Sequence, residues 1–291
     1  MKFSELPYIR PDLDQLRAQC DALCARFENA ASAEEQIAAY QDFEELSKDV
    51  MTNLTIASIR HTVDTRDEFY NAENDFSDEA SPQIEEMFQK FNQALLASKF
   101  RPELEKHYGT LIFKKAEISA RAFSPEILDL MQEENQLASQ YQRLYASGMV
   151  EFRGEKLPLP KLGPYMESPD RATRREAYAA RASFFEANRA ELDELYGKLI
   201  RCRNEQGRRL GHKNYIQLGY DRLGRNCYTP EDVAAFREQI ARDMVPIVAE
   251  RKQAQKERIG VDRICLYDDK FLFPDGNAKP EGTAEEILAA G

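Results

Sequence analysis

The sequence predicts an all-α protein, an elongated body of many helices with one small β-hairpin. Three observations carry this prediction. Apolar residues recur at helical spacing along most of the chain, capping residues stand ahead of these repeats, and one short segment alternates apolar and polar residues instead. With 291 residues, of which 42% are hydrophobic, the chain exceeds one average domain and can bury a sizeable core. We therefore expect two lobes or one elongated helical body.

Two helices are predicted in the first sixty residues. Residues 11–29 form the first, with Pro11 preset for its first turn. Ser32 with Glu35 matches the capping-box pattern that begins a helix, and a long helix follows. The apolar stripe of the first helix is Leu13, Leu16, Cys20, Leu23, Cys24 and Phe27, and that of the second is Ile37, Tyr40, Phe43, Leu46, Val50, Leu54 and Ala57.

A third long helix is predicted to begin at a second capping box, Thr65 with Glu68. Pro82 should break or kink it, because a proline removes a hydrogen bond from the helix interior. A short helix is predicted from about residue 109 to Phe123. The stripe of the third helix is Ile84, Met87, Phe88, Phe91 and Leu95.

Residues 124–126, Ser-Pro-Glu, have the composition of a helix start, and the helix that they begin should stop at Gly148. Its inward residues are Ile127, Leu130, Met131, Leu137, Tyr141 and Leu144. Several of these predicted helices exceed the mean length of about 11–12 residues. Long helices packed side by side explain this pattern.

Residues 149–157 alternate apolar and polar side chains around a glycine, as a small β-hairpin does. Prolines at 158, 160 and 164 then form a stiff connector. We expect a lobe boundary here. The predicted domains are an N-terminal helical lobe over 1–148, the hairpin and proline-rich connector over 149–165, and the start of a second helical domain over 166–291.

Residues 168–170, Ser-Pro-Asp, restart the helical pattern with a cap residue and a proline at the first helical position, and the helix should continue to about Arg209. Residues 229–232 cap one more helix. Pro246 should kink that helix, and Gly260 should end it. Its stripe is Val233, Phe236, Ile240 and Met244.

The last thirty residues are predicted to be extended chain and loop over 261–282, followed by a capping box, Thr283 with Glu286. The helix that this box begins has fewer than two turns, and such a short helix is not stable alone. We expect a chain cut within an element. A short terminal helix docked on the body is the alternative.

Charge and cysteine usage narrow the classes of function. The chain has 51 acidic and 40 basic residues, a net charge of −11, which argues against wholesale binding to nucleic acid or an anionic membrane. The sequence has no apolar signal core and no run approaching about 18 apolar residues. Its five cysteines, Cys20, Cys24, Cys202, Cys227 and Cys265, form no C-x-x-C pair. Cys20 and Cys24 share the stripe of residues 11–29, and we interpret them as buried small hydrophobes in a cytoplasmic protein.

No complete catalytic or metal-binding motif is present. His61, His107 and His212 are the only histidines, and none lies in H-E-x-x-H or at a paired ligand spacing. His61 could pair with the carboxylate of Asp64, but a partly exposed helical histidine is the better interpretation. Adjacent glutamates point about 100° apart on a helix, so they form solvated faces. These pairs are at 34–35, 44–45, 85–86, 133–134 and 285–286.

Two basic stretches invite a phosphate-binding interpretation. They contain Arg171, Arg174, Arg175, Arg181, Arg201, Arg203, Arg208, Arg209 and Lys213. Aromatic stacking platforms between these residues are absent, and acidic neighbours such as Glu176 and Glu186 interrupt the positive field. The sequence therefore favours helix surfaces covered by salt bridges, with phosphate binding as the alternative.

Several ordered strings resemble the oligoendopeptidase F-like zinc metallopeptidases, relatives of thimet oligopeptidase. One such string is SPDRATRREAY over residues 168–178. More specific are GHKNY at 211–215, GYDRLGRN at 219–226 and YTPEDV at 228–233. Residues 149–165 and 260–268 look similar too. The resemblance covers most of the chain and is strongest from about 145 to 270.

This resemblance implies a mostly helical, two-lobed body divided by a deep channel, with the N-terminal helices as one wall. In that family the zinc site uses the two histidines of H-E-x-x-H and a downstream glutamate, and the motif glutamate is the general base. No residue of this sequence corresponds to any of them. We therefore assign no catalytic, cofactor-binding or metal-binding residue, and we expect no zinc on residues 1–291.

The expected function is that of the N-terminal part of a zinc-dependent oligoendopeptidase, inactive alone, that acts on short unstructured peptides in the cytoplasm. Its expected partners are an oligopeptide substrate and the missing C-terminal catalytic half, with no nucleic acid and no membrane. The alternative is a free-standing helical scaffold or partner-binding protein. A scaffold should hide its apolar stripes, whereas a cut peptidase should expose a large apolar patch.

Overall fold

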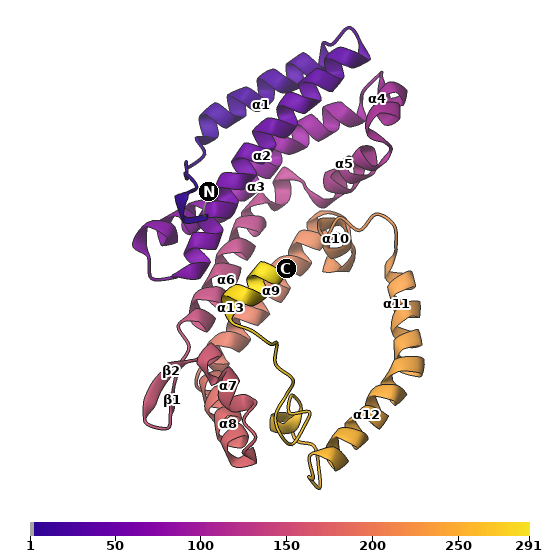
Figure 1. The fold of residues 1–291 in the computed structure, drawn as a ribbon. Coiled ribbons are helices and arrows are strands. Elements are labelled where there is room, and N and C mark those ends of the chain that lie inside the picture. The colour runs from indigo at the N-terminus through magenta and orange to yellow at the C-terminus, as the bar shows by residue number, and fades with distance from the viewer. Residues whose placement is uncertain (1–2) are drawn as a thin grey trace. The chain divides into compact units, whose positions relative to one another are not determined.

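The structure, a computed structural model, describes residues 3–291 and consists mainly of helices (Figure 1). Its contacts divide the chain into two units. The first contains the residues up to Ala146 together with Glu194–Thr229, and the second contains Ser147–Asp193 and Pro230–Gly291. The all-α prediction with one small hairpin is confirmed. The lobe boundary predicted at 149–165 stays a prediction.

Within residues 3–291, no helix combines the length and the apolar character needed to cross a bilayer.

The first unit is built on three long helices, α1 (Leu13–Glu28), α2 (Ala33–Val63) and α3 (Glu68–Leu96). Their predicted stripes meet in one core, in which Phe43 and Phe91 stack with ring centroids 4.0 Å apart. The remaining elements of this unit are η1 (Phe3–Glu5), α4 (Arg101–Tyr108), α5 (Leu111–Ala122), η2 (Pro125–Ile127), α6 (Leu128–Ala146) and α10 (Tyr215–Arg222). The helix α9 (Arg189–Arg209) runs from the second unit into the first.

Two predicted helix starts in this unit are wrong by two residues, each for the same reason. The first helix begins after Asp12, whose carboxylate accepts from the backbone N–H groups of Asp14 and Gln15, so Pro11 lies outside the helix. The third begins after Asp67 rather than at Thr65, because Asp67 accepts from the Tyr70 N–H. An aspartate is a strong N-cap, and it takes this role from a less favourable neighbour.

Pro82 lies inside α3 without ending it, so the break is wrong, and the kink that the sequence offered instead stays a prediction. A proline at this position leaves the carbonyl of Asp78 without its usual donor four residues on. The side chain of Asn135 in α6 supplies that donor, with Nδ2 3.0 Å from the Asp78 oxygen. Next to it, Gln132 Nε2 donates to the carbonyl of Glu79 at 2.8 Å. Side chains of the packed neighbour therefore satisfy the carbonyls around the proline.

The second unit contains the predicted hairpin. Strands β1 (Met149–Phe152) and β2 (Glu155–Pro158) pair antiparallel, with Phe152 opposite Glu155. The two turn residues, Arg153 and Gly154, have φ values of 53° and 82°. Positive φ at both positions is the requirement of a tight two-residue hairpin turn.

The long helix predicted over 168–209 is instead two helices. Asp170 caps α8 (Arg171–Ala187) by accepting from the N–H groups of Ala172 and Thr173, so Pro169 precedes the helix. The second helix, α9, follows after Asn188. The unit also contains η3 (Leu159–Leu162), α7 (Gly163–Met166), η5 (Leu266–Asp268) and α13 (Ala284–Ala290). The capping box predicted at Thr283 and Glu286 is confirmed.

The helix predicted after residue 229 is continuous through three segments: α11 (Pro230–Gln239), the π-helical turn η4 (Ile240–Met244) and α12 (Val245–Arg258). The wide turn just before Pro246 has the Val245 N–H bonded to the Ile240 carbonyl, one residue further back than in an α-helix. Gly260 ends the helix as predicted. Its φ is 68°, and its N–H donates to the Glu257 carbonyl at 3.2 Å.

Candidate functional site

The three histidines do not form a site. The prediction that His61 is partly exposed is wrong, because its side chain is fully buried in α2. Neither ring nitrogen has a hydrogen-bond partner among residues 3–291. Burial lowers its pKa, and the positive charge of Arg143 lowers it further. His107 is exposed in the last turn of α4, and His212 lies in the loop after α9. Nowhere in residues 3–291 do three or more His, Cys, Asp or Glu side chains gather in a group that could hold a metal ion.

All five cysteines are free thiols. Cys20 lies in the core of the first unit, and Cys24 packs against it, as the stripe predicts. Burial raises the pKa of both thiols to about 11, so they are protonated and unreactive at neutral pH. Cys202 is buried against α6, where its thiol donates to the Leu130 carbonyl at 3.1 Å. These contacts support the interpretation of Cys20 as a small buried hydrophobe and, in part, that of Cys24, which is half-buried; Cys202 is a further buried thiol.

The basic residues of α9 form ion pairs rather than an open anion site. Arg209 Nη1 lies 2.9 Å from Asp129 Oδ1, and Arg208 pairs with Glu205 at 3.4 Å. Arg203 lies 2.7 Å from Glu134. The prediction that these helix surfaces are covered by salt bridges is confirmed for these residues.

Glu134 of α6 is the centre of a polar cluster in the first unit. Its carboxylate accepts from Arg203 Nε at 2.7 Å, from Gln206 Nε2 at 2.9 Å and from Arg222 Nη1 at 2.6 Å. Burial opposes ionisation of Glu134, but the attraction of Arg222 and the hydrogen bonds from Arg203 and Gln206 outweigh it, and the pKa is lowered. A carboxylate held ionised by three donors joins α6, α9 and α10 and is a weak general base.

A cavity of about 540 Å³ lies beside this cluster. Its walls come from α3, α5, α6 and the end of α10. Asp221 lines the cavity and is 4% exposed, and its Oδ2 has no hydrogen-bond partner among the described residues. The size suits a small ligand. The charged lining residues are Glu85, Lys115, Glu134, Asp221 and Arg222.

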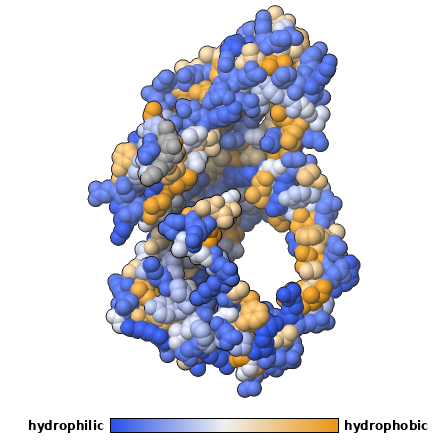
Figure 2. Space-filling model, viewed as in Figure 1, coloured by the Kyte–Doolittle hydropathy of each residue, from blue (hydrophilic) through white to orange (hydrophobic). Residues whose placement is uncertain are grey.

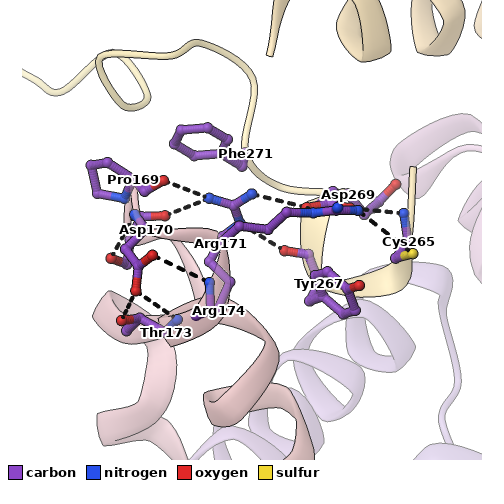
Figure 3. A network of polar contacts seen from close by, with 12 residues as sticks. Pro169, Asp170, Arg171, Thr173, Arg174, Cys265, Tyr267, Asp269 and Phe271 are labelled. Carbon is purple, nitrogen blue, oxygen red and sulfur yellow. Dashed lines mark hydrogen bonds and ion pairs between the residues drawn. The ribbon is translucent and has the colours of Figure 1, made fainter. Parts of the chain in front are cut away.

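A second polar network, which we call the Asp268 clamp, holds the second unit together (Figure 3). Arg174 Nη2 lies 2.9 Å from Asp268 Oδ1, and Arg171 Nη2 lies 2.8 Å from Oδ2. The guanidinium of Arg174 also donates to the carbonyls of Ser168 and Tyr267 and lies over the ring of Phe271, 4.0 Å from its centroid. The clamp therefore binds the segment after α12 to the start of α8.

Asp268 is fully buried with both of its oxygens paired. Burial raises the pKa of its carboxyl, but the hydrogen bonds from Arg171 and Arg174 outweigh burial and set the pKa at about 2. From the other side, Gln255 Nε2 of α12 donates to the carbonyls of Asp268 and Phe271 at 2.9 and 2.7 Å. Saturated by these donors, the clamp can position a segment but cannot transfer a proton at neutral pH.

The sequence analysis singled out the basic residues of the Asp268 clamp but not their acidic partner. Arg171 and Arg174 stood out as a basic cluster, but their partner Asp268 is almost a hundred residues away. Asp221 and Arg222 lie inside the GYDRLGRN string that carries the family resemblance. An Asp-Arg pair within the most specific string was the available signal, although it did not identify Glu134 as their neighbour.

Comparison with known proteins gives a consistent result. Residues 3–123 match the profile described as the Peptidase M3 N-terminal domain. Residues 164–281 match the profile described as Peptidase family M3. A search of curated proteins found no match.

Solved structures match the whole chain. Pz peptidase A, solved with an inhibitor, is 41% identical with a TM-score of 0.96, and the match covers 99% of this chain and 51% of that protein. A protein from Bacillus anthracis str. Ames described as an oligoendopeptidase F is 38% identical with a TM-score of 0.95, covering 99% of this chain and 53% of that one. The oligoendopeptidase-F of Enterococcus faecium, at 17% identity and a TM-score of 0.64, shares the fold over 96% of this chain and 57% of its own length.

The chain thus spans about half of the length of these solved relatives. Its fold matches the N-terminal lobe of oligoendopeptidase F, as the resemblance implied. Two profiles of one peptidase family, together with near-complete structural agreement at about 40% identity, point to the same relationship. The chain belongs to peptidase family M3, among its oligoendopeptidase F-like members.

Proposed function

We propose that this chain is the N-terminal part of a zinc-dependent oligoendopeptidase that hydrolyses peptide bonds in short unstructured peptides. In this proposal the chain forms one wall of the substrate channel and is inactive alone. The agreement with Pz peptidase A, 41% identity over 99% of this chain, is the observation that carries the proposal. Two helical lobes beside a cleft would admit flexible peptides and reject folded proteins, because only a narrow segment can enter.

Zinc would come with the other half of the enzyme. The described residues do not fit the metal, since a zinc site needs three or four nitrogen, sulfur or oxygen ligands, and no such group is present in residues 3–291. The chain's own contribution would be to bind and orient the peptide. The free cysteines agree with action in a reducing compartment, for which we propose the cytoplasm.

The rival proposal, a free-standing scaffold, predicts that apolar stripes are hidden. The helix through α11 and α12 instead has an exposed apolar stripe, in which Phe236 is 60% exposed and Met244 is 49% exposed. In Figure 2, hydrophobic colouring follows the arm that Figure 1 labels α11 and α12. An uncovered stripe of this kind favours a chain that works with a further polypeptide segment.

The test compares residues 1–291 alone with the same residues fused to the second half of a family relative that carries H-E-x-x-H. The fusion should cleave short fluorogenic peptides, spare folded proteins and lose activity with a chelator. Residues 1–291 alone should show no cleavage. Replacing the motif glutamate should abolish turnover with zinc still bound. A well-folded fusion without activity, or chelator-resistant cleavage by residues 1–291 alone, would refute the proposal.

A further inference from the structure

The helix that runs through α11, η4 and α12 carries an unusual amount of exposed apolar surface. Over its first twenty-odd residues no side chain is buried within the described part of the chain, and Gln255, near its end, is the only buried residue. Five of its exposed apolar residues are Phe236 (60%), Ile240 (39%), Met244 (49%), Ile247 (48%) and Val248 (50%), and Val245 (56%) is exposed beside them. We call these five residues the α11–α12 apolar face.

These residues lie along one stripe. The spacing from Phe236 to Ile240 and from Ile240 to Met244 is four residues, and Ile247 follows after three, so the side chains succeed one another turn by turn. This is the spacing with which a helix packs into a groove or against another helix. The π-helical turn of η4 adds a residue to one turn within this stripe, next to Pro246. The face is therefore a continuous apolar ridge.

Polar contacts hold the end of this helix. Gln255 donates to backbone carbonyls of the segment after the helix, and Lys252 Nζ lies 2.6 Å from Asp269 Oδ1. Arg258 Nη1 donates to the Leu272 carbonyl at 3.1 Å. The end that carries these contacts is thus fixed, while the apolar residues nearer the beginning have no cover in the described chain. The stripe follows from the sequence, and no described residue covers it.

The relatives indicate what that partner is. They match this chain over 99% of its length, and this match uses only 51% and 53% of theirs. They therefore possess a second half whose equivalent is not among the described residues. Charged residues of both signs accompany the face, such as Arg237, Arg242 and Asp243. The face therefore suits an apolar surface better than a strongly charged one.

We infer that the α11–α12 apolar face is the docking surface for the second half of the family's peptidase fold, and that an apolar helical surface of that half covers Phe236, Ile240 and Met244. This inference rests on the proposed function. It deepens that function by assigning the joint between the two halves to one helix. Burial of apolar side chains drives the docking, so its strength is nearly independent of salt.

The test measures binding of residues 1–291 to the purified second half of Pz peptidase A by calorimetry, with the first half of Pz peptidase A as the positive control. Wild-type residues 1–291 should bind, with similar affinity at low and high salt. Phe236→Glu and Met244→Glu should each weaken binding by roughly 30-fold or more, the loss typical of a central hot-spot residue. Hydrogen exchange should slow over residues 232–248 on binding.

Phe69→Glu is the matched control, because Phe69 is also a helical phenylalanine and is 56% exposed. It should leave binding within about twofold of wild type. Circular dichroism must show that each variant keeps its helix content. Affinities for Phe236→Glu and Met244→Glu equal to wild type would overturn the inference. Absence of binding by wild-type residues 1–291, with the positive control intact, would also overturn it.

A second copy of the chain is the other occupant to test. If residues 1–291 form a dimer that Phe236→Glu dissociates, and the second half does not bind, the face is a self-association surface and the inference is wrong. A measurement of peptidase activity distinguishes failure of the docking inference from failure of the proposed function. A fusion that cleaves peptides with Phe236→Glu in place and with unchanged stability contradicts the docking surface and leaves the proposed function standing.

Discussion

Two long helices of this protein carry an apolar stripe and an internal proline, but only one stripe is covered. In α3, Met87, Phe91 and Leu95 are at most 1% exposed, because helices of the same unit pack around them. In the helix through α11 and α12, Phe236 and Ile240 are 60% and 39% exposed. In the sequence, both helices show the same helical spacing of apolar residues. Periodicity identifies the apolar face of a helix, while burial depends on whether another segment is present to cover it.

The two prolines differ in the same way. Pro82 is buried, and the carbonyl that it leaves without a donor is satisfied from outside by Asn135. The chain accommodates Pro246 from within, by widening one turn from Ile240 to Met244. A helix with packed neighbours can use their side chains, whereas a helix without them changes its own hydrogen-bond register.

The largest expected effect contrasts one phenylalanine in each helix. Phe91→Ala should lower the free energy of unfolding by about 3–5 kcal/mol, because it leaves a cavity in a closed core. Phe236→Ala should change that free energy by no more than about 0.5 kcal/mol, because the side chain has few contacts to lose. Urea unfolding of both variants, followed by circular dichroism, measures the difference. Equal losses would mean that the exposed stripe is packed after all.

A smaller effect tests the polar anchorage at the end of α12. Asp268→Asn should lower the free energy of unfolding by roughly 2–3 kcal/mol, since hydrogen bonds to charged partners contribute about 1.5–3 kcal/mol. Asp275→Asn, at an exposed position, is the control and should have almost no effect. A neutral result for Asp268→Asn would show that the segment after α12 is held by something other than the clamp.

The same carboxyl gives a pH dependence. Its pKa in the folded protein is about 2, below the ordinary value of 3.8, so ionised Asp268 stabilises the fold. That stabilisation is complete above about pH 4 and is lost as the pH falls towards 2. Unfolding measured over this range should show the wild type and Asp268→Asn converging at the acid end. A constant difference down to pH 2 would contradict the assigned cause.

Most of the fold follows from local sequence signals. The stripes of residues 13–27 and 37–57, the hairpin at 149–158 and the helix stop at Gly260 each depend on residues close in the chain, and each appears as expected. The errors are local as well. Helix starts moved by two residues to Asp67 and Asp170, where an aspartate competes with a nearby Ser or Thr for the cap.

The polar clusters could be predicted only in part, because their members come from distant parts of the chain. Glu134 meets Arg222 across 88 residues, and Arg174 meets Asp268 across 94. A single sequence shows the charges but not which of them meet. It also cannot show that Asn135 compensates for Pro82, since that contact exists only when α6 packs on α3.

The smallest expected effect tests that last contact. Asn135→Ala should lower the free energy of unfolding by about 1–2 kcal/mol, because it leaves the Asp78 carbonyl without a donor. Pro82→Ala restores a backbone N–H at that turn, so Asn135→Ala should cause a smaller loss in this background. The difference between the two losses is a coupling energy, which double-mutant cycles resolve from about 0.5 kcal/mol upwards.

Asn53→Ala supplies the comparison for that cycle, since Asn53 Nδ2 donates at 3.0 Å to the Asp49 carbonyl within α2, where no proline interrupts the helix. Asn53 Oδ1 also accepts from the Ile9 N–H at 2.8 Å, so Asn53→Ala has a cost of its own, but that cost should be independent of residue 82. If Asn135→Ala destabilises the wild type and the Pro82→Ala variant equally, the side chain stabilises the packing of α6 on α3 without acting through the freed carbonyl. A coupling confined to Asn135 would show that α3 tolerates its proline because a neighbour packs beside it. The helix through α11 and α12 has no such neighbour in the described chain, and its widened turn next to Pro246 is the alternative solution.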